Sequence, residues 1–135
     1  MKRDPRLWRL SAEHHHALVL ARNLAALVGD GRANEAARQL VEHFDRELEP
    51  HFRVEEVLIL PALRAAGEVA LADRTVADHA FLRALAAAAA AGRCDDVATF
   101  AERLTEHVRF EERELFPCCE ARLSAAILDA VGGAG

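Results

Sequence analysis

The sequence contains no tyrosine, only one tryptophan and six phenylalanines among its 135 residues. Its apolar content, 52% in total, therefore comes mainly from leucine, valine and alanine. Leucine and alanine are strong helix formers. The scarcity of aromatic residues thus favours a helical core, and the absence of tyrosine leaves no phenol for radical chemistry.

Cysteine is also scarce, and positive charges are outnumbered by negative ones. The three cysteines, Cys94, Cys118 and Cys119, form no Cys-x-x-Cys pair. An odd number with this spacing does not suit a disulfide framework and favours a reducing cytoplasm. The formal net charge is -5 and the pI is about 5.8. An acidic chain of this kind does not suit a nucleic acid or an anionic membrane as partner.

Long apolar runs are missing too. The longest is residues 84–91, whereas a membrane-spanning helix needs about 20 apolar residues. Basic residues near the first methionine are not followed by an apolar stretch, so we expect no signal peptide. A chain of this length suits one domain, which we expect over residues 1–135 with a core of about 7–131.

What the sequence does contain is helical periodicity. Glycine-rich stretches at 28–34, 64–68 and 91–96 divide it into segments, and none has the alternation of a strand. The pattern predicts helices over 5–28, 33–65, 68–91 and 95–131. Short connections make neighbouring helices antiparallel, so the expected fold is all-α, an up-down-up-down four-helix bundle.

One motif occurs twice. The stretch HFRVEEVLILP begins at His51 and HVRFEERELFP begins at His107, which is 56 residues later. Both read His-x-Arg-x-Glu-Glu-x-x-x-x-Pro. The repeat indicates two helical hairpins of similar design, and the prolines inside the second and fourth helices are expected to kink or break them.

Each repeat places a histidine and a glutamate on the apolar face of its helix. His51 and Glu55 are four residues apart, as are His107 and Glu111. Residues at this spacing lie on one helix face, with Cβ atoms about 5–6 Å apart. A buried carboxylate costs several kcal/mol unless it is paired or bound to a metal. One such pair could satisfy itself, but two in register favour a divalent metal.

The other two predicted helices offer further ligands. His79 can face inward on the third helix, since Leu82 follows at the next turn. On the first helix the choice lies among three consecutive histidines. We favour His15, which Leu18 follows in the same way, with His14 as the alternative or as an outer partner; His16 is expected to be solvated.

Four histidines and two glutamates exceed the needs of one tetrahedral zinc. They suit two metal ions bridged by carboxylates. Mixed imidazole and carboxylate ligands with open positions favour non-haem iron, with manganese or zinc as competitors.

At these positions the chain resembles the hemerythrin-like domain, also called the HHE cation-binding domain. The resemblance covers about residues 7–123. The stretches that carry it are EHHHAL at 13–18, HFRVEE at 51–56, DHAFL at 78–82 and HVRFEERELFP at 107–117. It implies an antiparallel four-helix bundle that holds an oxo- or hydroxo-bridged di-iron centre. The ligands implied by position are His15, His51, Glu55, His79, His107 and Glu111, with Glu55 and Glu111 bridging.

Two positions depart from the oxygen-carrying hemerythrins. Those proteins have a second histidine four residues after the one on the third helix, where this chain has Arg83. They also use an aspartate five residues after the histidine of the fourth helix, where this chain has Glu112, although Glu111 has the better spacing. One fewer histidine resembles family members that sense or handle iron, oxygen or nitric oxide, some of them in oxidative or nitrosative stress.

We therefore expect a cytoplasmic metal-binding protein with two iron ions that binds or senses iron, oxygen or nitric oxide. The alternatives are a di-iron enzyme, such as an oxidase, a peroxidase-like or nitric-oxide-handling enzyme or an iron donor for repair, and a structural zinc-binding bundle. The enzyme ranks second because the sequence indicates no substrate pocket and contains no tyrosine.

Three lesser features complete the expectations. His43 and Glu47 are expected to form a surface pair. Cys118 is expected to pack in the core, and Cys119 to be more exposed and able to report oxidation. Arg83 faces inward, where it could cap a bridging carboxylate or extend its charged end to the end of the bundle.

Overall fold

The computed structural model describes residues 2–134, and all of their regular structure is helical, without a strand. The expected all-α class is therefore confirmed. The helical elements are η1 (Pro5–Leu7), α1 (Trp8–Gly29), α2 (Ala33–His43), η2 (Phe44–Leu48), α3 (Glu49–Val54), η3 (Glu55–Ile59), α4 (Leu60–Ala65), α5 (Val69–Ala90), α6 (Val97–Phe110), η4 (Glu111–Leu115), α7 (Phe116–Arg122) and α8 (Ala125–Gly133).

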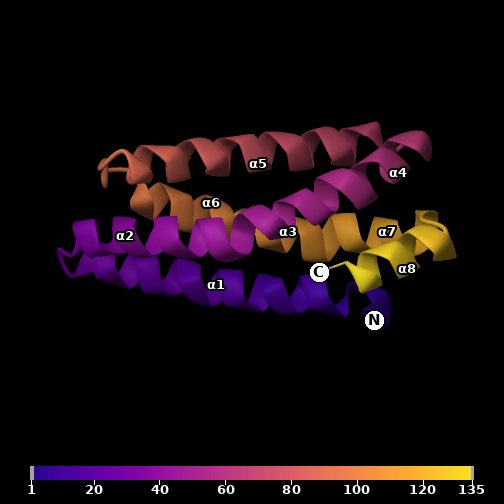
Figure 1. Cartoon of the computed structure of the whole chain (residues 1–135), viewed down its shortest axis with the longest axis horizontal. Coiled ribbons are helices and arrows are strands. Elements are labelled where there is room, and N and C mark those ends of the chain that lie inside the picture. The colour runs from indigo at the N-terminus through magenta and orange to yellow at the C-terminus, as the bar shows by residue number, and fades with distance from the viewer. Residues whose placement is uncertain (1, 135) are drawn as a thin grey trace.

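The long helical runs are α1, α2 through α4, α5, and α6 through α7, each continuous along the chain. They pack side by side as a bundle (Figure 1). α1 packs against α2 and α6, and α5 packs against the same two helices. The short helix α8 lies at the end that holds both chain termini, against η1 and η3. No helix among residues 2–134 combines the length and apolarity that crossing a membrane requires.

Three connections between helices use the same turn. Gly31, Gly67 and Gly92 have φ values of 76°, 89° and 90°, a conformation that glycine adopts without steric cost. In each turn the residue after the glycine donates its N–H to a carbonyl five residues earlier, as Arg32 does to Leu27. These are the breaks that the glycine-rich stretches predicted.

The prolines inside the helices are accommodated by π-helical turns. The N–H of Leu60 bonds the carbonyl of Glu55, five residues earlier, and Pro61 follows at once. The N–H of Phe116 bonds the carbonyl of Glu111 in the same way, just before Pro117. Since proline cannot donate an N–H and its ring crowds the preceding turn, one widened turn lets the helix continue. Both runs therefore stay helical, and the local disturbance expected at each of these prolines takes the form of one widened turn.

The fourth predicted helix is too long. It was expected over 95–131, but it ends at Arg122, because Leu123 and Ser124 are extended with ψ values of 146° and 160°. The hydroxyl of Ser124 accepts the N–H of Ile127 and starts α8. The chain therefore turns back and packs α8 on the end of the bundle.

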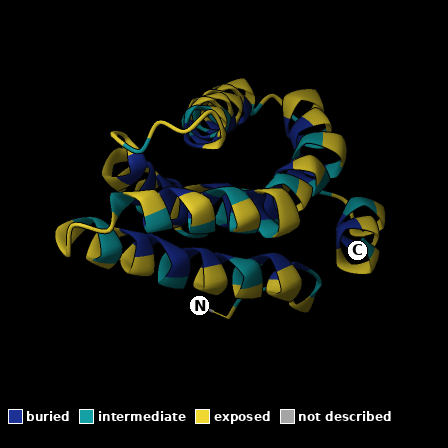
Figure 2. Ribbon diagram, turned by 60° about the vertical axis from the view of Figure 1, so that its left-hand side comes forward, coloured by how far each residue is buried: buried dark blue, intermediate teal, exposed yellow. Residues whose placement is uncertain are grey.

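The inward faces of the helices are buried along the whole bundle (Figure 2). The apolar core consists of two clusters. The turn-side cluster contains Leu20, Leu24, Leu40, Phe44, Phe52, Leu82, Phe100, Leu104 and Val108 among others. The terminus-side cluster contains Leu7, Leu10, Ile59, Leu63, Ala72, Leu115, Phe116, Cys119, Leu128 and Val131 among others. In every long run, buried polar residues lie where one cluster gives way to the other.

Candidate metal centre

Every long run contributes a buried imidazole to the layer between the two clusters. The four are His14 of α1, His51 of α3, His79 of α5 and His107 of α6. Their exposed fractions are 4%, 4%, 0% and 2%. Two carboxylates, Glu55 at the start of η3 and Glu111 at the start of η4, lie in the same layer and are fully buried.

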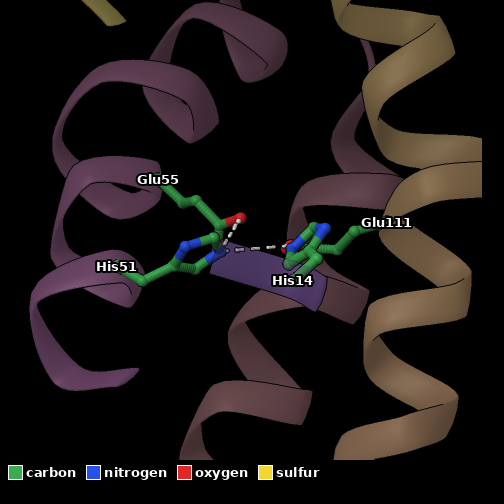
Figure 3. A group of neighbouring side chains, drawn as sticks. All are labelled: His14, His51, Glu55 and Glu111. Atoms are coloured by element: carbon green, nitrogen blue, oxygen red, sulfur yellow. Dashed lines mark hydrogen bonds and ion pairs between the residues drawn. The ribbon is translucent and has the colours of Figure 1, made fainter. Parts of the chain in front are cut away.

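These six residues form two groups that share their carboxylates. The first group is His14, His51, Glu55 and Glu111 (Figure 3). The second group is Glu55, His79, His107 and Glu111. Within each group, one nitrogen or oxygen atom of every residue lies within 4.8 Å of the others.

In the first group the ring nitrogens face the carboxylates closely. Nε2 of His14 lies 2.7 Å from Oε1 of Glu111, and Nε2 of His51 lies 3.0 Å from Oε2 of Glu55. Figure 3 shows all four side chains directed toward one another. His51 and Glu55 come from one continuous run, whereas His14 and Glu111 come from α1 and η4.

In the second group four buried atoms have no hydrogen-bond partner. They are Oε1 of Glu55, Nε2 of His79, Nε2 of His107 and Oε2 of Glu111. The Glu55–His79 and Glu111–His107 distances are 3.1 and 3.3 Å, yet the atoms are not aligned as hydrogen bonds. Buried polar atoms are normally satisfied. These donor atoms fit a divalent cation, which would satisfy all four at once and neutralise the carboxylates.

The other ring nitrogen of each imidazole is held by an outer carboxylate. The Nδ1–oxygen distances are 2.6 Å for His14–Glu112, 2.7 Å for His51–Glu13, 2.7 Å for His79–Glu56 and 2.9 Å for His107–Asp78. When Nδ1 donates to a carboxylate, a neutral imidazole keeps its lone pair on Nε2. All four imidazoles therefore present the nitrogen that binds metals to the centre, and the outer carboxylates make those nitrogens better ligands.

The second glutamate of each repeat acts across the bundle. Glu56 reaches His79 on α5, and Glu112 reaches His14 on α1. The paired glutamates of the motif thus have separate roles: the first lies inside the centre and the second orients a histidine of another helix.

The acidic residue before each single histidine has the matching role. Glu13 precedes His14 but bonds His51, and Asp78 precedes His79 but bonds His107. None of the outer carboxylates was identified from the sequence. The sequence did contain a signal for two of them: an acidic residue directly precedes a histidine at 13–14 and again at 78–79.

The same pairing of an acidic residue with a histidine indicates which histidine of the first helix faces inward. The prediction favoured His15, but the structure places His14 there. His15 is exposed, and His14 is the residue that lies in the cluster. Successive residues turn about 100° around a helix, so only one of the three histidines can face inward. His14 lies on the side of α1 that also buries Leu10 and Ala17. His16 is exposed, as expected.

Electrostatics keeps protons on three of the imidazoles, because the pKa values of His14, His51 and His107 are raised. Burial lowers the pKa of His107, but the carboxylates of Glu111 and Asp78 outweigh it and raise the pKa to about 10. The pKa values of His14 and His51 are raised above the ordinary value for the same reason. Burial raises the pKa of Glu111, but the neighbouring imidazoles hold it well below its usual range. Protons on these three imidazoles thus offset the charge of Glu111, and a cation would replace them.

A cavity of about 1100 Å³ reaches the centre from the side of α1 and α3. His14, His51 and His107 line it, together with Pro50 and Val54. His79 does not line it, and the ring of Phe52 stacks on one of its faces with centroids 3.9 Å apart. The first group therefore has both of its imidazoles on the cavity, and the second group has one.

The lesser features have mixed outcomes. His43 and Glu47 form the expected partly exposed pair. Cys118 packs against the terminus-side cluster as expected, although it is only partly buried. The expectation that Cys119 is the more exposed of the two is wrong, because Cys119 is fully buried in that cluster. Burial raises the pKa of the Cys119 thiol. Arg83 bonds the carboxylates of Glu49 and Glu56, neither of which is an inner carboxylate.

A comparison with protein families finds one that matches residues 7–119, and its description is Hemerythrin HHE cation binding domain. The matched range contains all six residues of the centre and the four outer carboxylates. Comparison with curated proteins and with solved structures gave no match.

Proposed function

Because the chain belongs to the hemerythrin HHE cation-binding family, we propose that its centre holds two non-haem iron ions, for which zinc or manganese could substitute. The observation that carries the proposal is the pair of four-residue groups that share two carboxylates. Glu55 and Glu111 would bridge the ions. His14 and His51 would bind one ion, and His79 and His107 the other.

The ligand set supports iron with room for a further ligand. Two imidazoles and two shared carboxylates provide fewer ligands than an octahedral iron accepts, and this mixture of ligands is typical of non-haem iron. When bound, the iron pair would supply a binding position for oxygen or nitric oxide. The cavity beside His14 and His51 supports approach of such a ligand from that side.

The surrounding residues would protect the centre. The two apolar clusters above and below the polar layer limit the access of water and acid. The outer carboxylates would keep each Nε2 directed inward while the ligand binds. Such a protein would bind or sense iron, oxygen or nitric oxide during oxidative or nitrosative stress, rather than act as a dedicated oxygen carrier.

The proposal extends to the domain organisation of the protein and to its location in the cell. We infer a single domain over residues 1–135, in which the four long runs form an up-down-up-down antiparallel bundle and α8 is an addition at one end. A cytoplasmic location suits the three free cysteines, because reducing compartments keep thiols unpaired.

Anaerobic loading with Fe(II), followed by metal analysis and absorption spectra, tests the function. We expect two irons per chain and a spectrum that changes when oxygen or nitric oxide is added. Glu111→Gln should bind less metal, whereas Glu47→Gln, at the surface pair, should bind as much as the unchanged protein. Less than one metal per chain would overturn the proposal. Sustained consumption of peroxide or nitric oxide would favour the enzyme, and binding of zinc alone the structural bundle.

A further inference from the structure

One arginine lies directly behind an outer carboxylate of the centre. The guanidinium of Arg83 donates from Nη1 to Oε2 of Glu56 at 2.8 Å and from Nη2 to Oε1 at 3.0 Å. Oε2 of Glu56 is also the atom 2.7 Å from Nδ1 of His79. The chain of contacts therefore runs from Arg83 through Glu56 to an imidazole of the centre.

The same guanidinium has a second anchor. Its Nε and Nη2 donate to the two oxygens of Glu49 at 2.7 and 3.0 Å. Glu49, Phe52 and Glu56 occupy one side of the α3–η3 run. Planar two-point contacts of this kind fix the relative orientation of the two side chains in addition to pairing their charges. Arg83 is thus held in place by one carboxylate while it holds another.

Phe52 completes the arrangement. Its ring stacks on His79 at an interplanar angle of 11°, and the guanidinium carbon of Arg83 lies 5.5 Å from the centroid of the same ring. His79 and Arg83 are four residues apart on α5, so both side chains contact the side of the α3–η3 run that carries Phe52. The position of the imidazole is set by the ring on its face and by Glu56 at its edge.

The contact of Arg83 with Glu56 is also tighter than the comparable contacts elsewhere. The outer carboxylate Glu112 lies 3.3 Å from Arg3, and Asp78 lies 3.6 Å from Arg74. His79 is also the one ligand that α5 provides to the centre within the described residues.

From these contacts we propose that Arg83 is a positioning residue of the centre: it locks Glu56, which orients His79 so that Nε2 points to Glu55. The loss of this lock would let the Glu56 carboxylate turn to solvent, since it is partly exposed. The effect on metal binding rests on the proposed function, whereas the effect on the His79 ring does not.

Arg83→Gln tests the lock, and Arg53→Gln is its matched control. Arg53 also bonds Glu49, at 3.1 Å, but is exposed. The first readout is the exchange rate of the Nδ1–H proton of His79, measured by NMR in metal-free and zinc-loaded protein. We expect Arg83→Gln to accelerate this exchange about tenfold or more, and Arg53→Gln to leave it unchanged.

The second readout is zinc affinity, measured by competition with a chelator. Loss of an outer partner weakens metal binding about 10–100-fold, so we expect Arg83→Gln to weaken one of the two zinc sites about tenfold. Arg83→Lys keeps the charge without the two-point contact and should give intermediate values. It also carries the test if Arg83→Gln does not fold.

Unchanged exchange and affinity in the Arg83 variants would overturn the proposal. If the unchanged protein bound neither an iron pair nor a zinc pair, the proposed function would fail, and the exchange rate alone would then decide whether Arg83 positions His79.

Discussion

Each imidazole of the centre has a carboxylate at both ring nitrogens, one inner and one outer. For His14 these are Glu111 at 2.7 Å and Glu112 at 2.6 Å. An imidazole held in this way cannot turn without breaking a buried contact, and an unsatisfied buried polar group costs about 1–3 kcal/mol. The orientation of the metal-facing nitrogens is therefore built into the metal-free protein.

Adjacent histidines on α1 allow a sharp test of this conclusion. His14→Ala removes one of two imidazoles from the first group, so we expect loaded protein to retain about one metal per chain. His15→Ala changes an exposed side chain and should retain two. Metal analysis after loading with zinc and removal of the excess measures both. Loss of metal in His15→Ala together with two metals in His14→Ala would show that α1 presents the other histidine.

How far the sequence predicts these residues depends on the distance over which each signal acts. The spacing of His51 and Glu55, and of His107 and Glu111, is a local property of a helix, so both pairs were identified. The choice between His14 and His15 depends on a rotation of about 100°, which three consecutive histidines do not resolve. The outer carboxylates act between helices, and only the packed bundle shows which histidine each one meets.

At the scale of elements, the inner carboxylates begin widened turns. Glu55 opens η3 and Glu111 opens η4, and the backbone carbonyl of each accepts the N–H that closes its π turn. The proline that follows each turn, Pro61 or Pro117, prevents an ordinary helical bond there. The repeated proline ten residues after each histidine therefore fixes a helix irregularity beside the centre, a common place for π-helical turns.

The start of α8 gives a prediction at this scale. Ser124→Ala removes the hydroxyl that caps the helix, and such caps contribute about 1 kcal/mol. Because Leu128 and Val131 of α8 are buried against the bundle, we expect the free energy of unfolding in urea to fall by about that amount. Ser124→Asp keeps a capping oxygen and should stay close to the unchanged protein. Equal losses in both variants would indicate that the cap does not stabilise α8.

The helix boundaries show the same division between local and distant signals. Glycine turns were read correctly because glycine acts within one turn, as at Gly31, Gly67 and Gly92. The break at Leu123 was missed, although Ser124 before an apolar run is a capping signal. The apolar residues of α8 continue the composition of the preceding helix, so periodicity alone did not separate the two.

At the scale of the whole molecule, a charged layer separates two apolar clusters. In metal-free protein, the carboxylates of Glu111 and Asp78 outweigh the effect of burial and keep the pKa of His107 at about 10 against an ordinary 6.5. A group whose pKa is raised on folding stabilises the folded protein below its unfolded pKa, and this contribution disappears as the pH rises through the folded pKa. An imidazole bound to a metal does not carry this extra proton, so its contribution to stability does not fall in the same way as the pH rises.

We therefore expect the proton of His107 alone to cost metal-free protein about 4 kcal/mol of its free energy of unfolding between pH 7 and pH 10, since each pH unit costs about 1.4 kcal/mol per proton. Zinc-loaded protein, freed of excess metal, should change much less over this range and should release its metal as the pH falls, because protons compete for the imidazoles. Urea unfolding at several pH values measures the first effect, and dialysis with metal analysis the second. His107→Gln should make the metal-free curve less steep, because the amide does not titrate whereas His14 and His51 still do. A metal-free protein whose stability rose toward pH 10 would contradict the raised pKa, and with it the view that protons and metal compete for one layer.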